Sequence, residues 1–275
     1  MVISWLDGQE AWLIVSLLFL AMMLGGELAY HLGRRMTALL TKDGKDNTSK
    51  THFNIVLSSL LGLLALLLSF TFGMAAQRYE ERRLMMIDDV TTLGTLYLRT
   101  CALPEPQKHQ MMVLLRQYVD LRPMAVPLLD DLKAFDDDET QSRALLIQML
   151  DLTEKMQNTV PAIKGSDDVT SAFLDAAANH TRRLSALSNR VPDSVIWMLL
   201  GAAIIGLSAI GYSGGLVRHR DIPAQIMLSI LVCGTIYVIL DLDRPHRGLL
   251  QQDQAPMIRL QQIIDQNPDA QGGSS

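Results

Sequence analysis

The ionisable residues that could do chemistry in an apolar setting lie at two places in this sequence. Glu27 and His31 are four residues apart, so a helix would carry both side chains on one face. A carboxylate inside an apolar segment is a candidate for a proton or ion path. The alternative is an ion pair of Glu27 with His31 or Arg34 close to a membrane boundary, which the neighbouring basic residues favour.

The second place is the run from Asp241 to Gly248, which holds two carboxylates, two guanidinium groups and an imidazole. It follows an apolar segment directly. Asp241, Asp243 and Arg244 could form a fixed ion-pair network or a polar ring at the mouth of a pore. A simple anchor at the membrane interface is the alternative.

Other polar features give little support for catalysis or metal binding. The acidic run Asp136 to Glu139 could offer oxygen ligands to Ca²⁺, but the spacing and glycine of an EF-hand are missing, and a solvated loop that caps a helix explains it as well. No P-loop, HExxH, GxSxG or CxxC motif occurs. The sequence therefore predicts no enzyme, no cofactor and no metal site.

Four apolar windows are the elements that must position these residues: Trp12–Tyr30, Ile55–Ala76, Val195–Tyr212 and Ile222–Leu240. Glu27 is the only residue within them that carries a charge at neutral pH. A bilayer core about 30 Å thick needs roughly 20 helical residues, so each window predicts a membrane span. Small residues in the third window, such as Gly206 and Gly211, would let helices approach closely in lipid.

The segment between the second and third spans predicts an all-α, water-soluble insert. No proline interrupts the chain after the second span, so one helix should continue to about Thr100, with Leu84, Ile87 and Leu98 repeating along one face. We expect the following divisions: a first span and basic loop at 1–54, a second span at 55–76, a helical extramembrane domain at 77–193, third and fourth spans at 194–248, and a polar, partly disordered tail at 249–275.

Charge indicates the partners and the orientation. The formal net charge of -5 argues against nucleic acid as a partner. Lys and Arg concentrate in the loop 34–54 and recur at Arg218 and Arg220, which predicts that these loops are cytoplasmic. The insert and both termini would then lie outside the cytoplasm, on the far side of a bacterial inner membrane.

The sequence resembles the bestrophin-like membrane family, in the run Gly62 to Phe72, the charged stretch Arg78 to Arg83, and Asp241 to Pro245. His246 departs from the aromatic residue expected there. The resemblance implies a distant relation to bestrophins, which are pentameric anion channels gated at a hydrophobic neck, and it implies a four-span layout. In bestrophins the insert is cytosolic, so the resemblance and the charge pattern predict opposite orientations.

These expectations combine into a hypothesis of an oligomeric, channel-like membrane protein. The second spans would line a narrow path, with Phe70 and Phe72 as its constriction and Asp241 and Asp243 near its mouth. Its partners would be the lipid bilayer, further copies of the chain and an inorganic ion. The alternative is a non-conducting membrane scaffold or sensor that couples the helical domain to the bilayer.

Overall fold

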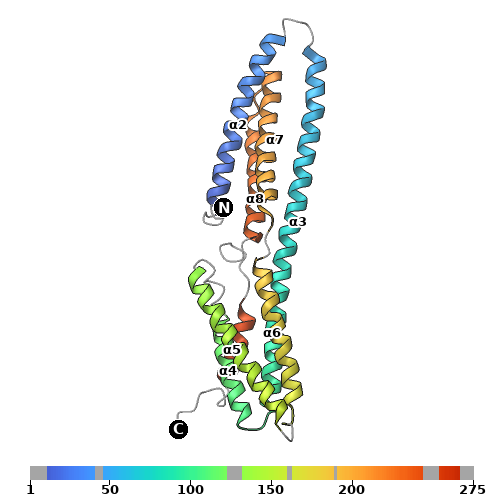
Figure 1. The fold of residues 1–275 in the computed structure, drawn as a ribbon. Coiled ribbons are helices and arrows are strands. Elements are labelled where there is room, and N and C mark those ends of the chain that lie inside the picture. Colours follow the sequence, from blue (N-terminus) through green and yellow to red (C-terminus); the bar gives the residue numbers. More distant parts are fainter. Residues whose placement is uncertain are drawn as a thin grey trace. The chain divides into compact units, whose positions relative to one another are not determined.

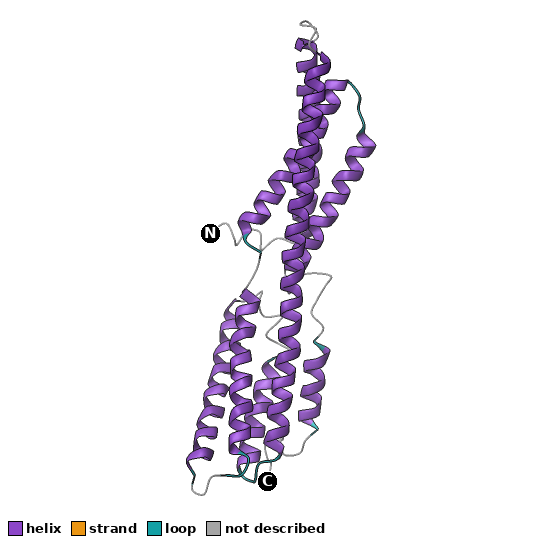
Figure 2. Ribbon diagram, turned by 90° about the vertical axis from the view of Figure 1, so that its right-hand side faces the viewer, coloured by secondary structure: helices purple, strands orange, loops and turns teal. Residues whose placement is uncertain are grey.

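A computed structural model of the chain describes residues 11–40, 46–122, 132–159, 163–188, 191–243 and 254–266. Within these ranges the chain is helical and contains no strand (Figure 2). The prediction of an all-α protein is therefore confirmed. The helices are labelled in Figure 1: α2 (Ala11–Leu40), α3 (Asp46–Cys101), α4 (Gln107–Leu121), α5 (Leu132–Asn158), α6 (Ser166–Ser188), α7 (Asp193–Val217), α8 (Ile222–Asp243) and α9 (Ala255–Asp265).

The chain divides into two compact units. Unit 1 comprises Met1–Tyr79 and Arg190–Leu250, and unit 2 comprises Glu80–Asn189 and Gln251–Ser275. Helix α3 contributes its first part to unit 1 and its last part to unit 2. Among the described residues, α2, α3, α7 and α8 are long and apolar enough to cross a membrane. This agrees in number and place with the four predicted spans.

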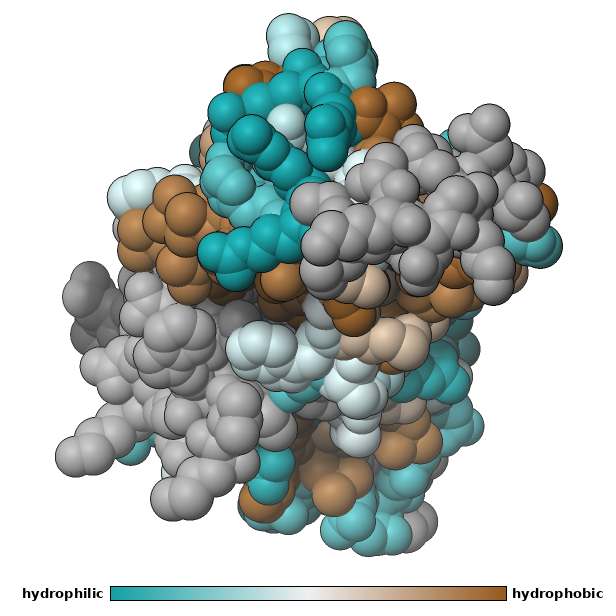
Figure 3. All heavy atoms as spheres, turned by 90° about the horizontal axis from the view of Figure 1, so that it is seen from above, coloured by the Kyte–Doolittle hydropathy of each residue, from teal (hydrophilic) through white to brown (hydrophobic). Residues whose placement is uncertain are grey.

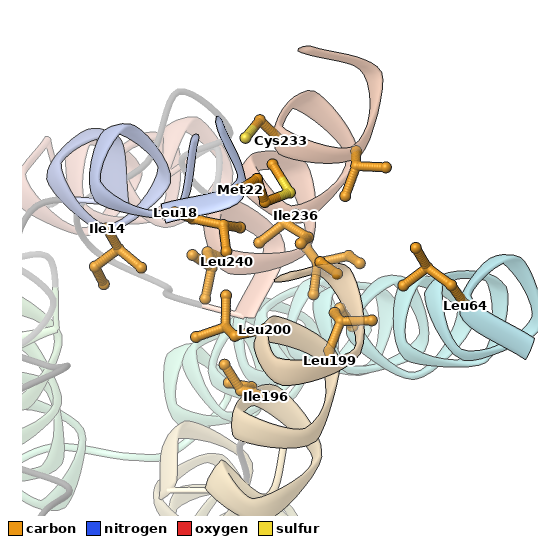
Figure 4. Close-up of a cluster of buried hydrophobic side chains, with 14 of the residues drawn as sticks. Ile14, Leu18, Met22, Leu64, Ile196, Leu199, Leu200, Cys233, Ile236 and Leu240 are labelled. Atoms are coloured by element: carbon orange, nitrogen blue, oxygen red, sulfur yellow. The ribbon is translucent and has the colours of Figure 1, made fainter. Parts of the chain in front are cut away.

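The core of unit 1 is formed by apolar side chains from the four candidate spans. In Figure 4, Leu18 and Met22 of α2 lie close to Ile236 of α8, while Leu199 of α7 lies on the side of the cluster that faces α3. All four side chains are buried. Much of the remaining apolar surface of these helices is exposed, as expected for helices that face lipid.

Helices α2 and α7 make the closest approach in unit 1. A Cβ atom added at Gly211 would overlap the carbonyl oxygen of Gly26, and one added at Gly215 would overlap that of Tyr30. Thr37 of α2 donates a hydrogen bond from its hydroxyl to the carbonyl oxygen of Leu216, at 3.1 Å. Small residues therefore bring the two backbones into contact, as predicted for Gly211.

Unit 2 has its own core, built from helices α3, α4, α5, α6 and α9. Helix α5 packs on α4 and on α6, and α9 packs on α4. The fully buried side chains include Leu93 and Leu96 of α3, Leu115 and Tyr118 of α4, and Ile264 of α9. These residues recur every three or four positions along their helices, which is the spacing of one helix face.

The structure corrects two expectations about unit 2. Leu84, Ile87 and Leu98, predicted as a repeating apolar face of α3, are exposed, while Leu93 and Leu96 are buried. Both sets satisfy a helical period, so periodicity alone could not select the packed face. The acidic run expected in a loop lies inside α5, since no proline or glycine breaks that helix.

Two further differences concern helix ends. Helix α3 begins at Asp46, earlier than the predicted Ile55. Part of the predicted polar tail forms the short helix α9, whose Met257, Leu260 and Ile264 are buried. An amphipathic helix of this length has no stability of its own in water, so its apolar face must be packed to hold it.

Candidate functional site

A buried cluster of charged and polar side chains lies among the helices of unit 2. We call it the buried polar cluster, and its members are Asp89 of α3, Tyr118 of α4, Arg122 at the end of α4, Glu139 of α5, and His180 and Arg183 of α6. It brings four helices together through side chains that otherwise belong in water. Such groups persist in a protein interior only when they are paired or hydrogen-bonded.

Helix α4 positions the first part of the cluster. Arg122 is its C-terminal cap residue, and the backbone N–H of Arg122 donates to the carbonyl oxygen of Val119. A cation at this end is favoured by the partial negative charge of the exposed carbonyl groups. The guanidinium of Arg122 lies over the ring of Tyr118, 4.3 Å from its centroid. The two residues are four apart and so share a helix face.

His180 connects this end of α4 to α5, and its partners define its protonation. Its Nδ1 lies 3.0 Å from Nη2 of Arg122 and 3.0 Å from the hydroxyl of Tyr118. A guanidinium can only donate, so Nδ1 accepts. The proton of the neutral ring is therefore on Nε2, which lies 3.2 Å from Oε1 of Glu139 and donates to it.

Asp89 compensates the charge of the two arginines. Its Oδ1 lies 3.9 Å from Nη2 of Arg122, and its Oδ2 lies 3.5 Å from Nη1 of Arg183. Only 1% of its surface is exposed. Neither carboxylate oxygen has a hydrogen-bond partner among the described residues. The two contacts are therefore electrostatic rather than hydrogen-bonded.

Burial shifts the pKa values of the cluster. It lowers the pKa of Arg122 to about 10, against the opposing effect of the Asp89 carboxylate. Burial and the adjacent Arg122 charge also lower the pKa of His180, while Glu139 opposes the shift. Burial raises the pKa of the neighbouring Asp138. At neutral pH Arg122 is therefore a cation and His180 is uncharged, as its hydrogen bonds require.

The arrangement suits structural coupling better than catalysis. It contains no serine or cysteine that His180 could activate, and both ring nitrogens are engaged. Within the described ranges, no three His, Cys, Asp or Glu side chains gather closely enough to hold a metal ion. The cluster can instead fix the positions of α3, α4, α5 and α6, because breaking any one contact leaves a buried charge or polar group unpaired.

Of the residues predicted to do chemistry, Glu27 and His31 are in contact with each other. Nε2 of His31 lies 3.1 Å from Oε1 of Glu27, and both carboxylate oxygens accept from Arg220. Arg220 also lies over the ring of Tyr30, at 5.2 Å from its centroid. The side chains are about half exposed. The geometry is that of an ion pair at a surface, with Arg220 as a partner that the sequence did not suggest.

Asp241 and Asp243 lie at the end of α8 and are almost completely buried, with 3% and 5% of their surfaces exposed. Oδ1 of Asp243 accepts a hydrogen bond of 2.8 Å from the backbone N–H of Val191, which lies just before α7. This burial favours a fixed polar network that ties α8 to the start of α7, rather than an open ring. Arg244 lies outside the described residues.

Phe70 and Phe72 lie on α3 within unit 1 and do not share a helix face. Their side chains are 65% and 42% exposed. Residues two apart on an α-helix point about 200° away from each other. The face of α3 that packs in unit 1 carries Leu64, Thr71 and Ala75. Phe70 points further from this face than Phe72, so the structure separates two residues that were predicted to act together.

The sequence contains a signal for the buried polar cluster that was missed. Asp89 lies four residues before Leu93 and seven before Leu96, so it occupies the same helix face as the buried core. His180 likewise follows Ala176 and Phe173 at helical spacing. An ionisable residue on an apolar face indicates a buried polar partner. The identity of that partner depends on the packing of helices that are remote in sequence.

Comparison with known proteins gives one family match and several structural ones. The family model described as a Bestrophin-like domain matches residues 36–257. No curated protein sequence matches the chain.

The structural matches cover nearly the whole chain. A crystal structure of a bacterial bestrophin homologue from Klebsiella pneumoniae aligns with a TM-score of 0.62 at 12% identity, covering 90% of this chain and 99% of that one. A mutant of a bacterial bestrophin homologue from the same organism aligns with a TM-score of 0.63 at 11% identity, covering 90% of this chain and 97% of that one. A further structure, of a membrane protein, aligns with a TM-score of 0.63 at 12% identity and with the same coverage of both chains. Identity this low shows a common fold and nothing finer.

Proposed function

The chain belongs to the bestrophin-like family, and on that premise we propose that it is an oligomeric, channel-like membrane protein. The bestrophins to which this family is related are ion channels. Four helices of suitable length and composition support a multi-pass arrangement, with the helical domain 77–193 between the second and third spans and outside the bilayer.

The observation that carries this proposal is the exposed apolar surface of α3. Leu63, Leu66 and Phe70 recur at three and four residues on one face of this helix, and all are exposed in a single chain. Water would not tolerate such a face, so lipid or further copies of the chain must cover it. Contact with further copies around a narrow path accounts for it, and hydrophobic constrictions of this kind close a path by dewetting.

Within this proposal Phe70 is the constricting residue, and Phe72 occupies another face of α3. The test is conductance of the purified full chain in planar bilayers. We expect Phe70→Ala to raise the current or the open fraction, because the smaller side chain widens and wets the constriction. Phe72→Ala removes the same side chain from the same span and is the matched control. Absence of conductance under any ion or voltage would remove the channel hypothesis.

One feature favours the alternative of a non-conducting scaffold or sensor. Helix α3 runs without a break from Asp46 to Cys101, so a single helix belongs to both units and could couple them mechanically. Chemical crosslinking in membranes distinguishes the two hypotheses. A ladder that ends in a closed ring of several copies supports the channel, whereas a monomer or simple dimer supports the scaffold.

For the orientation we propose, on the distribution of Lys and Arg, that the loop 34–54 and the connection between α7 and α8 face the cytoplasm. Unit 2 and both termini would then face outward from the inner membrane. Single cysteines at an exposed position of unit 2 and at Arg218, probed with a membrane-impermeant thiol reagent, test this. Labelling of Arg218→Cys in intact cells would contradict the proposed orientation. It would indicate the opposite one, in which the insert is cytosolic as in bestrophins.

A further inference from the structure

Exposed basic residues gather where α2 and α7 end. Arg34 and Arg35 lie on the last part of α2, and Arg218, His219 and Arg220 form the connection between α7 and α8. All five are exposed. In the view from above, hydrophilic residues lie beside hydrophobic ones (Figure 3).

The close approach of α2 and α7 brings the two sets of basic residues together. A Cβ atom at Gly215 would lie 2.9 Å from the backbone nitrogen of Arg34, so the chain at Arg34 abuts the last turn of α7. Three residues after Gly215, Arg218 caps α7 in a left-handed conformation with φ of 57°, and its N–H donates to Gly214 and Gly215. Guanidinium groups that are remote in sequence therefore extend from one small region.

Three of these guanidinium groups have no anionic partner among the residues that the structure describes. Arg220 is engaged by the Glu27 carboxylate. The nearby Asp221 accepts from the backbone N–H of Ala224 in the first turn of α8. Among the described residues, no carboxylate pairs with Arg34, Arg35 or Arg218. Within the described part of the chain, these three arginines are therefore free to meet an anion from outside the protein.

Exposed apolar side chains border the arginines directly. Leu28 and Leu32 precede Arg35 by seven and three residues, so all three share one exposed face of α2. Val217, also exposed, immediately precedes Arg218. The surface therefore changes from apolar to cationic within one helical turn. A phospholipid presents the complementary order, with acyl chains followed by a phosphate.

We propose that Arg34, Arg35 and Arg218 bind a phospholipid with a net negative headgroup. The guanidinium groups donate to the phosphate oxygens, a pairing that their planar geometry favours. Leu32 and Val217 contact the acyl chains. This inference does not depend on whether the protein conducts ions, since it concerns another helix face and another ligand.

Native mass spectrometry of the full chain in mild detergent tests the proposal. Phosphatidylglycerol and phosphatidylcholine with identical acyl chains are added at equal concentration. The bound lipid is identified from the mass that it adds to the protein. We expect the wild type to retain phosphatidylglycerol preferentially. Removing two basic side chains near an anionic headgroup, at about 1 kcal/mol each, should reduce that preference by roughly thirtyfold. The variant is Arg34→Gln with Arg218→Gln.

The control is Lys155→Gln with Lys164→Gln, which removes the same charge from exposed positions of unit 2 and should leave the preference unchanged. Equal retention of both lipids, or an equal loss in the control, overturns the proposal. So does displacement of the lipid by inorganic phosphate alone, which would indicate a site for a soluble anion. If the arginine variant does not fold, raised salt with the wild type replaces it, and a salt-insensitive preference also overturns the proposal.

Discussion

Replacing Asp89 by asparagine should loosen unit 2 more than its small change in size suggests. The substitution keeps the shape of the side chain and removes its negative charge. Two buried guanidinium groups, at 3.5 and 3.9 Å from the carboxylate, then lose their compensating anion. At an effective dielectric constant of about 20, each attraction corresponds to roughly 4 to 5 kcal/mol before the cost of desolvation is subtracted.

The net effect is smaller than this sum. Removing one partner of a buried ion pair typically costs about 3 to 5 kcal/mol, and we expect the lower end because no hydrogen bond joins Asp89 to either arginine. A loss of about 3 kcal/mol in local opening free energy corresponds to roughly a hundredfold faster amide hydrogen exchange. The faster exchange should appear in α4 and α6, which carry Arg122 and Arg183.

Hydrogen exchange with mass spectrometry on the full chain in detergent measures this change by peptide. The control is Glu80→Gln, which breaks the exposed pair of Glu80 with Arg83 at 3.4 Å and should cost less than about 1 kcal/mol. If Asp89→Asn leaves protection in α4 and α6 within about threefold of the wild type, the two arginines do not depend on Asp89 and the reasoning is wrong.

Three more predictions follow from other contacts. Burial lowers the pKa of His180 below 6.5, so the stabilisation from its neutral form is complete above that pH and is lost as the pH falls. The thermal midpoint should therefore drop on acidification, and it should drop less in His180→Gln. Gly211→Leu should destabilise unit 1 by about 3 kcal/mol through overlap with the α2 backbone, whereas Gly201→Ala, which meets nothing within 4 Å, should be tolerated, as thermal unfolding in detergent would show. Asp243→Ala should cost about 1 to 3 kcal/mol by leaving the Val191 N–H unpaired, and faster exchange at the start of α7 would report it.

The spans were predictable because their signal is local. An uninterrupted apolar run such as Ile55–Ala76 has to be shielded from water, and length and composition decide that without knowledge of neighbours. The continuation of α3 was predictable for a similar reason, since no proline interrupts it. Helix α9 was missed because it is short and has polar residues on both sides, and only its packing in unit 2 buries Met257, Leu260 and Ile264.

The candidate sites were less predictable because they depend on partners that lie far apart in the sequence. Glu27 and His31 share a helix face by spacing alone, but Arg220 reaches them only through the packing of the bundle. His180 appeared isolated in the sequence, although α4 and α5 bring Tyr118, Arg122 and Glu139 into hydrogen-bonding contact with it. Phe70 and Phe72 looked equivalent by composition, and helix geometry separates them.

The contact between α2 and α7 has a consequence for the biogenesis of the protein. Thr37 and Leu216, which join the two helices, are separated by 179 residues. During synthesis the glycine-bearing side of α2 enters the bilayer long before its partner exists, and it remains against lipid while all of α3 to α6 is made. Completion of unit 1 is therefore a late step, and a chain truncated before Asp193 would leave α2 inserted without the surface to which its glycines are fitted.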